Sequence, residues 1–132
     1  MHHYMEVKTD TKEKFHVISV AATNLSANMT EELCTDLNNY LHQEIKNVVL
    51  KLINVKEMDE ESGESLVKIQ QKFYESGASF VFCELAPSLE TFLDDKGLLE
   101  LMNITPTESE AWDIIQMEEI ERELLGDEES GL

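Results

Sequence analysis

A dense run of acidic side chains between residues 57 and 64 holds the groups of this chain best suited to chemistry. Asp59, Glu60, Glu61 and Glu64 surround the dipeptide Ser62-Gly63. A helix start offers unpaired amide groups and a positive dipole end, which favour carboxylates. Three interpretations follow: solvated acids of a first helical turn, a contact surface for a partner, or ligands of a divalent cation.

The other signals of catalysis are missing around this run. Consecutive carboxylates point in different directions along a helix, and no matching His or Asp lies nearby in sequence, which disfavours a metal site. Ser62 and Ser65 lack both a Gly-x-Ser-x-Gly elbow and a glycine-rich phosphate loop. His16 and His42 are isolated and suit structural or surface roles. We therefore expect no enzyme, with no catalytic residue, no cofactor and no metal.

Charge narrows the class of partner. The chain has 28 Asp and Glu against 10 Lys and Arg, a formal net charge of −18 at pH 7. Nucleic-acid binding needs basic groups that release counterions, and anionic lipid likewise attracts basic segments. We expect neither nucleic-acid binding nor direct membrane binding. The acidity favours either a cationic partner or simple solubility.

Periodicity predicts the elements that must position the acidic run. Alternating or continuous apolar residues indicate strands over 15–22, 48–53 and 79–85, with a short last strand within 98–104 and a first strand over 4–9. Apolar residues at helical spacing predict helices near 28–43, 61–76, 88–95 and 107–122. Asn28 with Glu31, and Thr107 with Glu110, have the spacing of capping boxes.

This order predicts one α/β domain over residues 1–125, followed by a flexible acidic tail over 126–132. Its sheet is mixed and mainly parallel, with four or five strands and about four helices. The sequence holds no run of 18 apolar residues and no signal-like N-terminus. Cys34 and Cys83 occur without a C-x-x-C motif, so we expect free thiols in a reducing cytoplasm.

The last predicted helix has two interpretations. Met117, Ile120, Leu124 and Leu125 extend its apolar pattern well past Ile115. The helix is then either a longer one packed along the sheet, or an amphipathic acidic helix that contacts a partner or a second copy of the chain. A homodimer is thus one of the open alternatives.

Three stretches resemble the STAS family of bacterial anti-sigma-factor antagonists. Residues 47–52 followed by Met58-Asp59 are similar to the family's buried strand ending in Met-Asp. Residues 77–82 are similar to its Gly-Gly turn and next strand. Residues 86–93 with Gly97-Leu98 are similar to its Ser-Pro helix that ends in a Gly-Leu pair. The resemblance covers about residues 15 to 115.

The resemblance implies a partner and a switch position. Family members of the sporulation and stress-response type bind an anti-sigma kinase, which phosphorylates a Ser in an Asp-Ser-Ser/Thr-Gly motif. Without a gap, Asp59 matches the family Asp, Glu60 replaces the acceptor Ser, and Ser62 replaces Gly. A one-residue shift would align Ser62-Gly63 with the motif's end, but it needs an insertion.

The expected binding surface also includes a neighbouring loop. In Asn24-Leu25-Ser26, Ser26 stands where the family often has an acidic residue. We expect Asp59 and Glu60 to be exposed beside this loop, as one acidic patch.

Three functions compete. The first is a regulatory module that binds an anti-sigma factor or a kinase-fold regulatory protein, without the usual Ser switch. The second is a fixed STAS subunit of a larger assembly, such as a stressosome-like scaffold or a lipid-transporter complex. The third is an enzyme that uses a divalent cation held by the acidic run.

Overall fold

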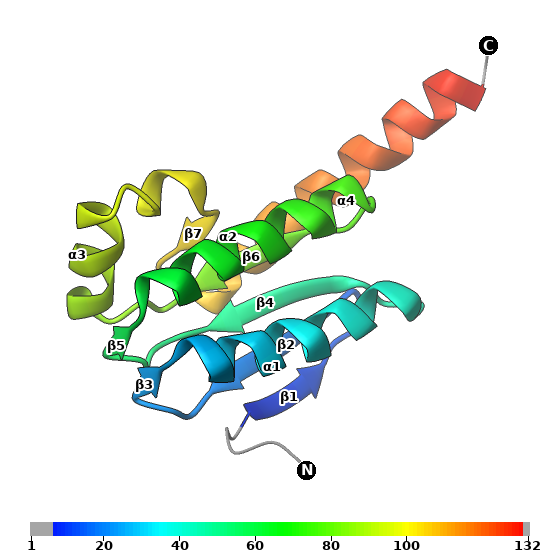
Figure 1. Ribbon diagram of the computed structural model, residues 1–132. Helices are drawn as coiled ribbons and strands as arrows, with labels where there is room; N and C mark the ends of the chain where they lie inside the picture. The colour runs from blue at the N-terminus through cyan, green and yellow to red at the C-terminus, as the bar shows by residue number, and fades with distance from the viewer. Residues whose placement is uncertain (1–6, 131–132) are drawn as a thin grey trace.

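A five-stranded sheet organises the chain, in the order β1-β2-β4-β6-β7 (Figure 1). The structure is a computed structural model that describes residues 7–130, the last five of them as backbone. The strands are β1 (Val7–Thr11), β2 (Phe15–Val20), β4 (Asn47–Lys51), β6 (Phe80–Cys83) and β7 (Ile104–Thr105). β1 is antiparallel to β2, and every other pair is parallel. The predicted mixed, mainly parallel sheet is confirmed.

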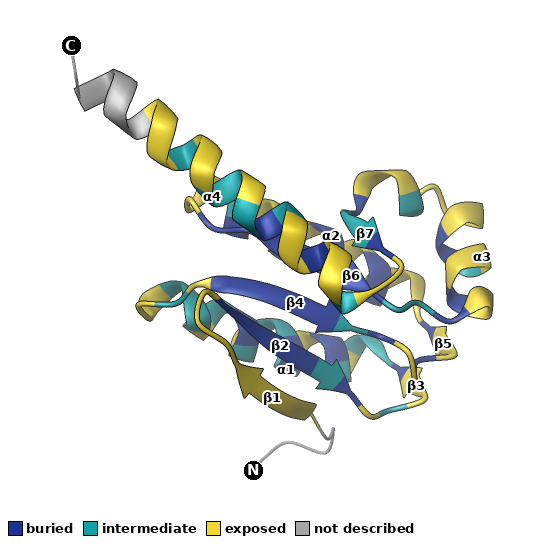
Figure 2. Ribbon diagram, turned by 180° about the vertical axis from the view of Figure 1, so that it is seen from behind, coloured by how far each residue is buried: buried dark blue, intermediate teal, exposed yellow. Residues whose placement is uncertain are grey.

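Helices cover both faces of this sheet. On one face lie α1 (Ala27–Asn39) and α2 (Glu60–Glu75), with the shorter α3 (Pro87–Asp95) beyond the end of the sheet. On the other face lies α4 (Glu108–Ser130), seen in front of the sheet in Figure 2. Two apolar clusters result, a large one under α1 to α3 and a small one that joins Val49 and Val81 to Ala111 and Ile115 of α4.

The predicted helices all occur, with shifted ends. α1 begins at Ala27 because Ser26, not Asn28, is its cap: the Ser26 hydroxyl accepts a hydrogen bond from the Met29 amide at 3.3 Å. α1 is followed by a short 3-10 helix, Tyr40–His42. At the start of α4 the predicted Thr107–Glu110 pair forms, with the Glu110 amide donating to the Thr107 hydroxyl at 3.2 Å.

The ends of several other elements were predicted wrongly. The strand expected over 15–22 ends at Val20, the strand expected over 79–85 spans Phe80–Cys83, and the strand expected within 98–104 is Ile104–Thr105. The strand expected over 48–53 ends at Lys51, and Ile53 is 46% exposed in the turn that follows. α4 runs to Ser130 rather than to residue 122. The flexible tail over 126–132 stays a prediction. Of the first strand expected over 4–9, residues 4–6 lie outside the described residues.

The cysteines and His16 have structural surroundings. Both thiols are free, Cys83 buried and Cys34 half-buried. His16 is buried, with one ring nitrogen 2.8 Å from the Thr11 hydroxyl and the other 2.8 Å from the Ile45 carbonyl. Its polar atoms are therefore used in holding β2 to its neighbours.

Candidate partner-binding site

Two short strands bring together the two segments that the sequence singles out. β3 (Asn24–Leu25) pairs in parallel with β5 (Glu57–Met58), with Asn24 opposite Glu57 and Leu25 opposite Met58. Because β3 leads directly into α1 and β5 into α2, the starts of these helices are held side by side (Figure 1). The acidic run and the loop around residue 25 therefore form one surface.

Asp59 fastens this pair of helix starts. It is the N-cap residue of α2, in extended conformation, but its side chain makes no bond to its own helix. Instead, its Oδ2 accepts a hydrogen bond from the Ala27 amide, the first of α1, at 2.9 Å. Its own amide donates to the Leu25 carbonyl at 3.3 Å. One carboxylate thus satisfies an otherwise unpaired amide of the neighbouring helix.

Ser62 is a buried structural residue. Its side chain is fully inaccessible, and its hydroxyl donates a hydrogen bond to the Leu25 carbonyl at 3.0 Å. A kinase would have to break this bond and extract the hydroxyl from the protein interior. The position suits a cross-link between α2 and β3, and it does not suit a phosphate acceptor.

Gly63 allows α3 to approach α2 closely. A methyl group at this position would lie 2.7 Å from Leu98 Cδ1 and 3.2 Å from Leu93 Cδ2, both closer than ordinary van der Waals contact. The residue is buried within the first turn of α2. Its role is therefore one of packing, because a side chain here would push against the segment that follows α3.

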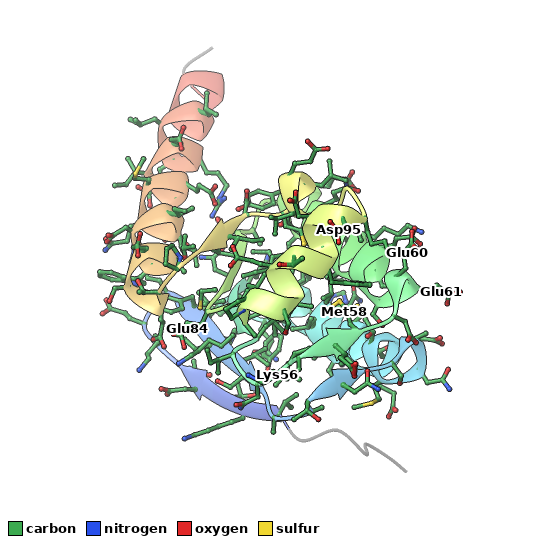
Figure 3. All side chains as sticks on the ribbon, turned by 90° about the vertical axis from the view of Figure 1, so that its left-hand side faces the viewer. Lys56, Met58, Glu60, Glu61, Glu84 and Asp95 are labelled. Atoms are coloured by element: carbon green, nitrogen blue, oxygen red, sulfur yellow. The ribbon has the colours of Figure 1, made fainter. Side chains whose placement is uncertain are left out.

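Glu60 and Glu61 are exposed carboxylates at the start of α2. Figure 3 looks onto this end of the molecule and labels both at the start of α2. Glu60 forms an ion pair with Lys96 at 3.7 Å, with both side chains about half exposed. Such a pair is screened by water and contributes little to stability. Both carboxylates are therefore available to a partner.

The eight predicted site residues divide into two groups. Asn24, Asp59, Glu60 and Glu61 are exposed, whereas Leu25, Ser62 and Gly63 are buried beneath them and Ser26 is half-buried as the α1 cap. Glu57, which pairs with Asn24 across the two short strands, and Glu64 are exposed as well. Loop residues contribute no charge of their own, so the acidity of the surface comes from β5 and α2.

Sequence reasoning missed two neighbours of this surface. Ile53 is an exposed large apolar residue, in the turn that leads to β5. The almost wholly apolar run from Val48 onward predicts this residue as the last one of a buried strand. Lys96, the partner of Glu60, lies between Asp95 and Gly97 and carries no local signal of the pair.

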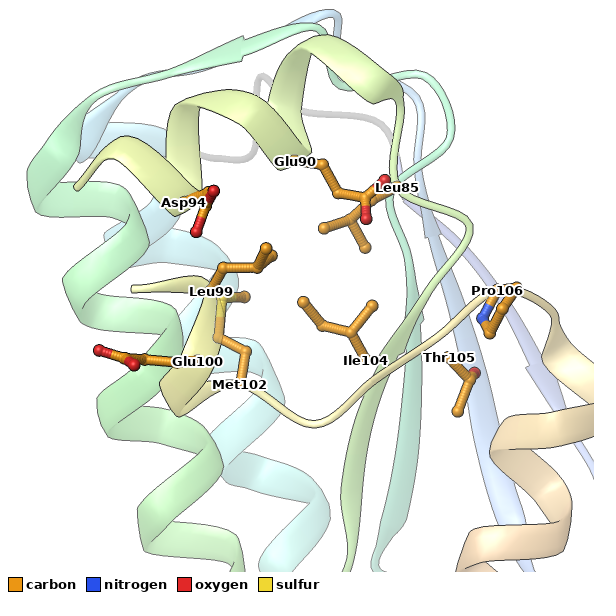
Figure 4. A pocket seen from close by; sticks show the side chains of 9 residues that line it. All are labelled: Leu85, Glu90, Asp94, Leu99, Glu100, Met102, Ile104, Thr105 and Pro106. Atoms are coloured by element: carbon orange, nitrogen blue, oxygen red, sulfur yellow. The ribbon is translucent and has the colours of Figure 1, made fainter. Parts of the chain in front are cut away.

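A concave surface lies between α3 and β7 (Figure 4). Its volume is about 660 Å³. Carboxylates of Glu90, Asp94 and Glu100 stand around apolar side chains that include Leu99 and Ile104. The fold thus offers a further acidic hollow, made of residues other than those of the acidic run.

A small charged cluster lies at the carboxyl ends of β4 and β6. The Lys51 ammonium is 3.3 Å from Glu108 and 3.6 Å from Glu84, whose backbone has a positive φ of 57°. Partial burial acts to lower the pKa of Lys51, but its hydrogen bond to Glu108 and the negative charges of Glu84 and Glu108 together outweigh this and raise the pKa above its usual value. The cluster fastens the start of α4 to the sheet.

Residues 7–125 contain neither a metal-binding cluster nor a membrane-spanning helix. Within residues 7–125, no three His, Cys, Asp or Glu side chains are gathered so that they could hold a metal ion. In the same part of the chain, no helix combines the length and apolarity that crossing a bilayer requires.

Comparison with known proteins now identifies the fold. An anti-sigma-factor antagonist (STAS) domain protein from Planctomyces limnophilus is similar, with 18% identity, a TM-score of 0.70, and coverage of 83% of this chain and 97% of that one. The anti-sigma factor antagonist SpoIIAA of Bacillus, in its unphosphorylated form, has 14% identity, a TM-score of 0.67, and coverage of 84% and 96%.

A membrane protein contains the same fold. The murine anion transporter Slc26a9 has 12% identity and a TM-score of 0.66, and the match covers 79% of this chain and 18% of the transporter. No curated protein matches the sequence. The model of the STAS domain matches residues 6–111. The chain therefore belongs to the STAS domain family, as its three motif stretches indicated.

Proposed function

We propose that this protein is a non-enzymatic, cytoplasmic regulatory module of the anti-sigma-factor antagonist type. It presents Asn24, Asp59, Glu60 and Glu61 to an anti-sigma factor or a related kinase-fold regulator. The usual Ser switch is absent. One observation supports the absence of the switch: Glu60, which the gapless resemblance aligns with the family's acceptor, is exposed, while the nearby Ser62 is buried and hydrogen-bonded.

The chemistry of Glu60 supports a fixed negative charge in place of a reversible phosphorylation. A phosphoserine carries about −1.5 to −2 charges, whereas a carboxylate carries one and offers no hydroxyl to a kinase. Glu60 therefore holds a fixed negative charge at the start of α2. Its ion pair with Lys96 is weak enough to be exchanged for a partner's basic group.

A substitution at residue 60 tests the proposal. In Glu60→Ser, the anti-sigma-type kinase of the same organism should add a phosphate with ATP, seen by mass spectrometry, while the wild-type chain stays unmodified at Ser62. The matched control is Glu61→Ser, which makes the same chemical change one residue further on and should stay unmodified.

Calorimetric titration of the kinase with the unmodified chain and with both variants measures how much each side chain contributes to the affinity. If Glu60 opposes docking as a built-in phosphate would, Glu60→Ser binds more tightly; if it pairs with a basic group, the variant binds more weakly, by about 1 kcal/mol or more. Either change supports an interface here, provided that Glu61→Ser changes less. Unchanged affinity in both variants contradicts it.

A second candidate is a fixed subunit of a larger assembly. It is favoured by the same lack of an exposed hydroxyl at the switch position, since a permanent subunit needs no switch. The STAS fold within the murine transporter gives it a precedent. Purification from the native cell separates the two: a permanent subunit co-purifies in constant stoichiometry, whereas a partner-switching module dissociates when its partner's nucleotide is changed.

A further inference from the structure

The outer half of α4 exposes large apolar side chains that nothing in the described structure covers. Met117, Ile120 and Leu124 are 63%, 56% and 59% exposed. Figures 1 and 2 show this half of the helix leaving the body of the domain. Of the two interpretations of this helix from sequence, apolar packing against the sheet therefore holds only for its first half, where Ala111 and Ile115 are buried.

The three side chains form one stripe. With 100° between successive residues, Met117, Ile120 and Leu124 fall within about 60° of the helix circumference. Their spacing, i, i+3 and i+7, is that of positions a, d and a of a coiled coil. Ala111, Ile115 and Arg122, which face the body, lie on the opposite side of the helix. The stripe thus points away from the rest of the domain.

Polar contacts hold this half of α4 in place. The Tyr74 hydroxyl donates to Glu118 at 2.8 Å, the Asn47 amide donates to Glu119 at 2.7 Å, and Arg122 donates to the Ser79 hydroxyl at 3.1 Å. The helix is therefore already formed and oriented up to Arg122. A partner that binds the stripe does not have to order α4, which lowers the cost of association.

Charges beside the stripe select the partner. In the same heptad, Glu121 takes position e and Glu123 takes position g, and both are exposed. In a coiled coil of two copies, these positions would place Glu against Glu in either orientation, which is repulsive. A partner helix with Lys or Arg at these positions would be attracted instead.

We propose that the stripe Met117–Ile120–Leu124 binds a basic amphipathic helix of another protein, as one half of a short two-stranded coiled coil. This surface is separate from the start of α2. A chain could therefore hold one partner through α4 while its acidic run contacts another.

A pair of peptides tests the proposal with the full chain. Both have about three heptads with Leu and Ile at a and d, one with Lys and the other with Glu at e and g. Fluorescence anisotropy should show binding of the Lys peptide and none of the Glu peptide. Ile120→Ser should weaken binding about tenfold or more. Leu101→Ser, which changes an equally exposed residue elsewhere, should leave it unaltered.

A charge exchange separates this contact from general attraction to an acidic protein. The double variant Glu121→Lys with Glu123→Lys stays strongly acidic overall but should now prefer the Glu peptide. Continued preference for the Lys peptide would overturn the proposal. Equal losses of affinity for the Lys peptide in Ile120→Ser and Leu101→Ser would also overturn it. So would analytical ultracentrifugation that shows a dimer of the unmodified chain and a monomer of Ile120→Ser.

Discussion

Replacing Asp59 by Ala should destabilise the protein more than the loss of any other carboxylate in the acidic run. The substitution removes the carboxylate that accepts the Ala27 amide at 2.9 Å and leaves the first amide of α1 without this partner. Hydrogen bonds to charged groups contribute about 1.5–3 kcal/mol, and loss of a helix cap costs about 0.5–2 kcal/mol. Because Asp59 is exposed to water, which replaces part of the lost bond, we expect about 1–2 kcal/mol.

Two further variants separate the contributions to this loss in the free energy of unfolding. Asp59→Asn keeps an acceptor oxygen of similar shape and removes the charge, so it should cost about half as much. Glu61→Ala removes an exposed acid from the same helical turn, and should cost only a few tenths of a kcal/mol.

Equilibrium unfolding in urea, followed by Trp112 fluorescence, measures all three variants. The slope with urea should be unchanged, so that the midpoint reports stability directly. If Asp59→Ala and Glu61→Ala shift the midpoint equally, Asp59 acts only as another first-turn acid. Its hydrogen bond to the Ala27 amide then adds nothing measurable to stability.

Three further predictions concern the buried residues near the site and the thiols. Gly63→Ala should gain up to about 1 kcal/mol in helix propensity but lose about 1–3 kcal/mol by collision with Leu98, a net loss that thermal unfolding would detect. Ser62→Ala should cost about 1 kcal/mol in the same assay, and no loss would show that its buried hydrogen bond is weak. Burial raises the pKa of Cys34 to about 11 and that of Cys83 to about 12. Both groups keep their protons in the folded chain after the unfolded chain begins to lose them near about pH 8.5, so they cause the free energy of unfolding to fall above that pH. Urea unfolding at pH 7 and pH 10 should show a smaller fall for Cys83→Ala than for the unmodified chain.

The sheet and the order of helices could be predicted because each rests on local periodicity. The β-branched alternation from Phe15 and the turn glycines at residues 77 and 97, both with positive φ, specify where elements begin and end. The motif stretches then identified the family, which gave the position of the acidic run at the start of α2.

The sequence predicts where the candidate site lies, but it does not predict the roles of the individual residues. Which residues of the acidic run are buried depends on α3: only the approach of Leu98 to Gly63 explains why a glycine stands there. The bonds of Asp59 to Ala27 and of Ser62 to Leu25 join residues more than 30 positions apart. Such contacts leave no trace in local sequence, so the run resembled a set of equivalent solvated acids.

β1 gives the sheet an edge that water reaches on both sides. All five of its residues are exposed, whereas the first four residues of β4, two places inward, are buried. The strand gains its ladder of hydrogen bonds with β2 but almost no apolar burial, so little free energy opposes its detachment. Its amide protons should therefore exchange with deuterium through local opening, many times faster than those of β4, which require the whole domain to unfold.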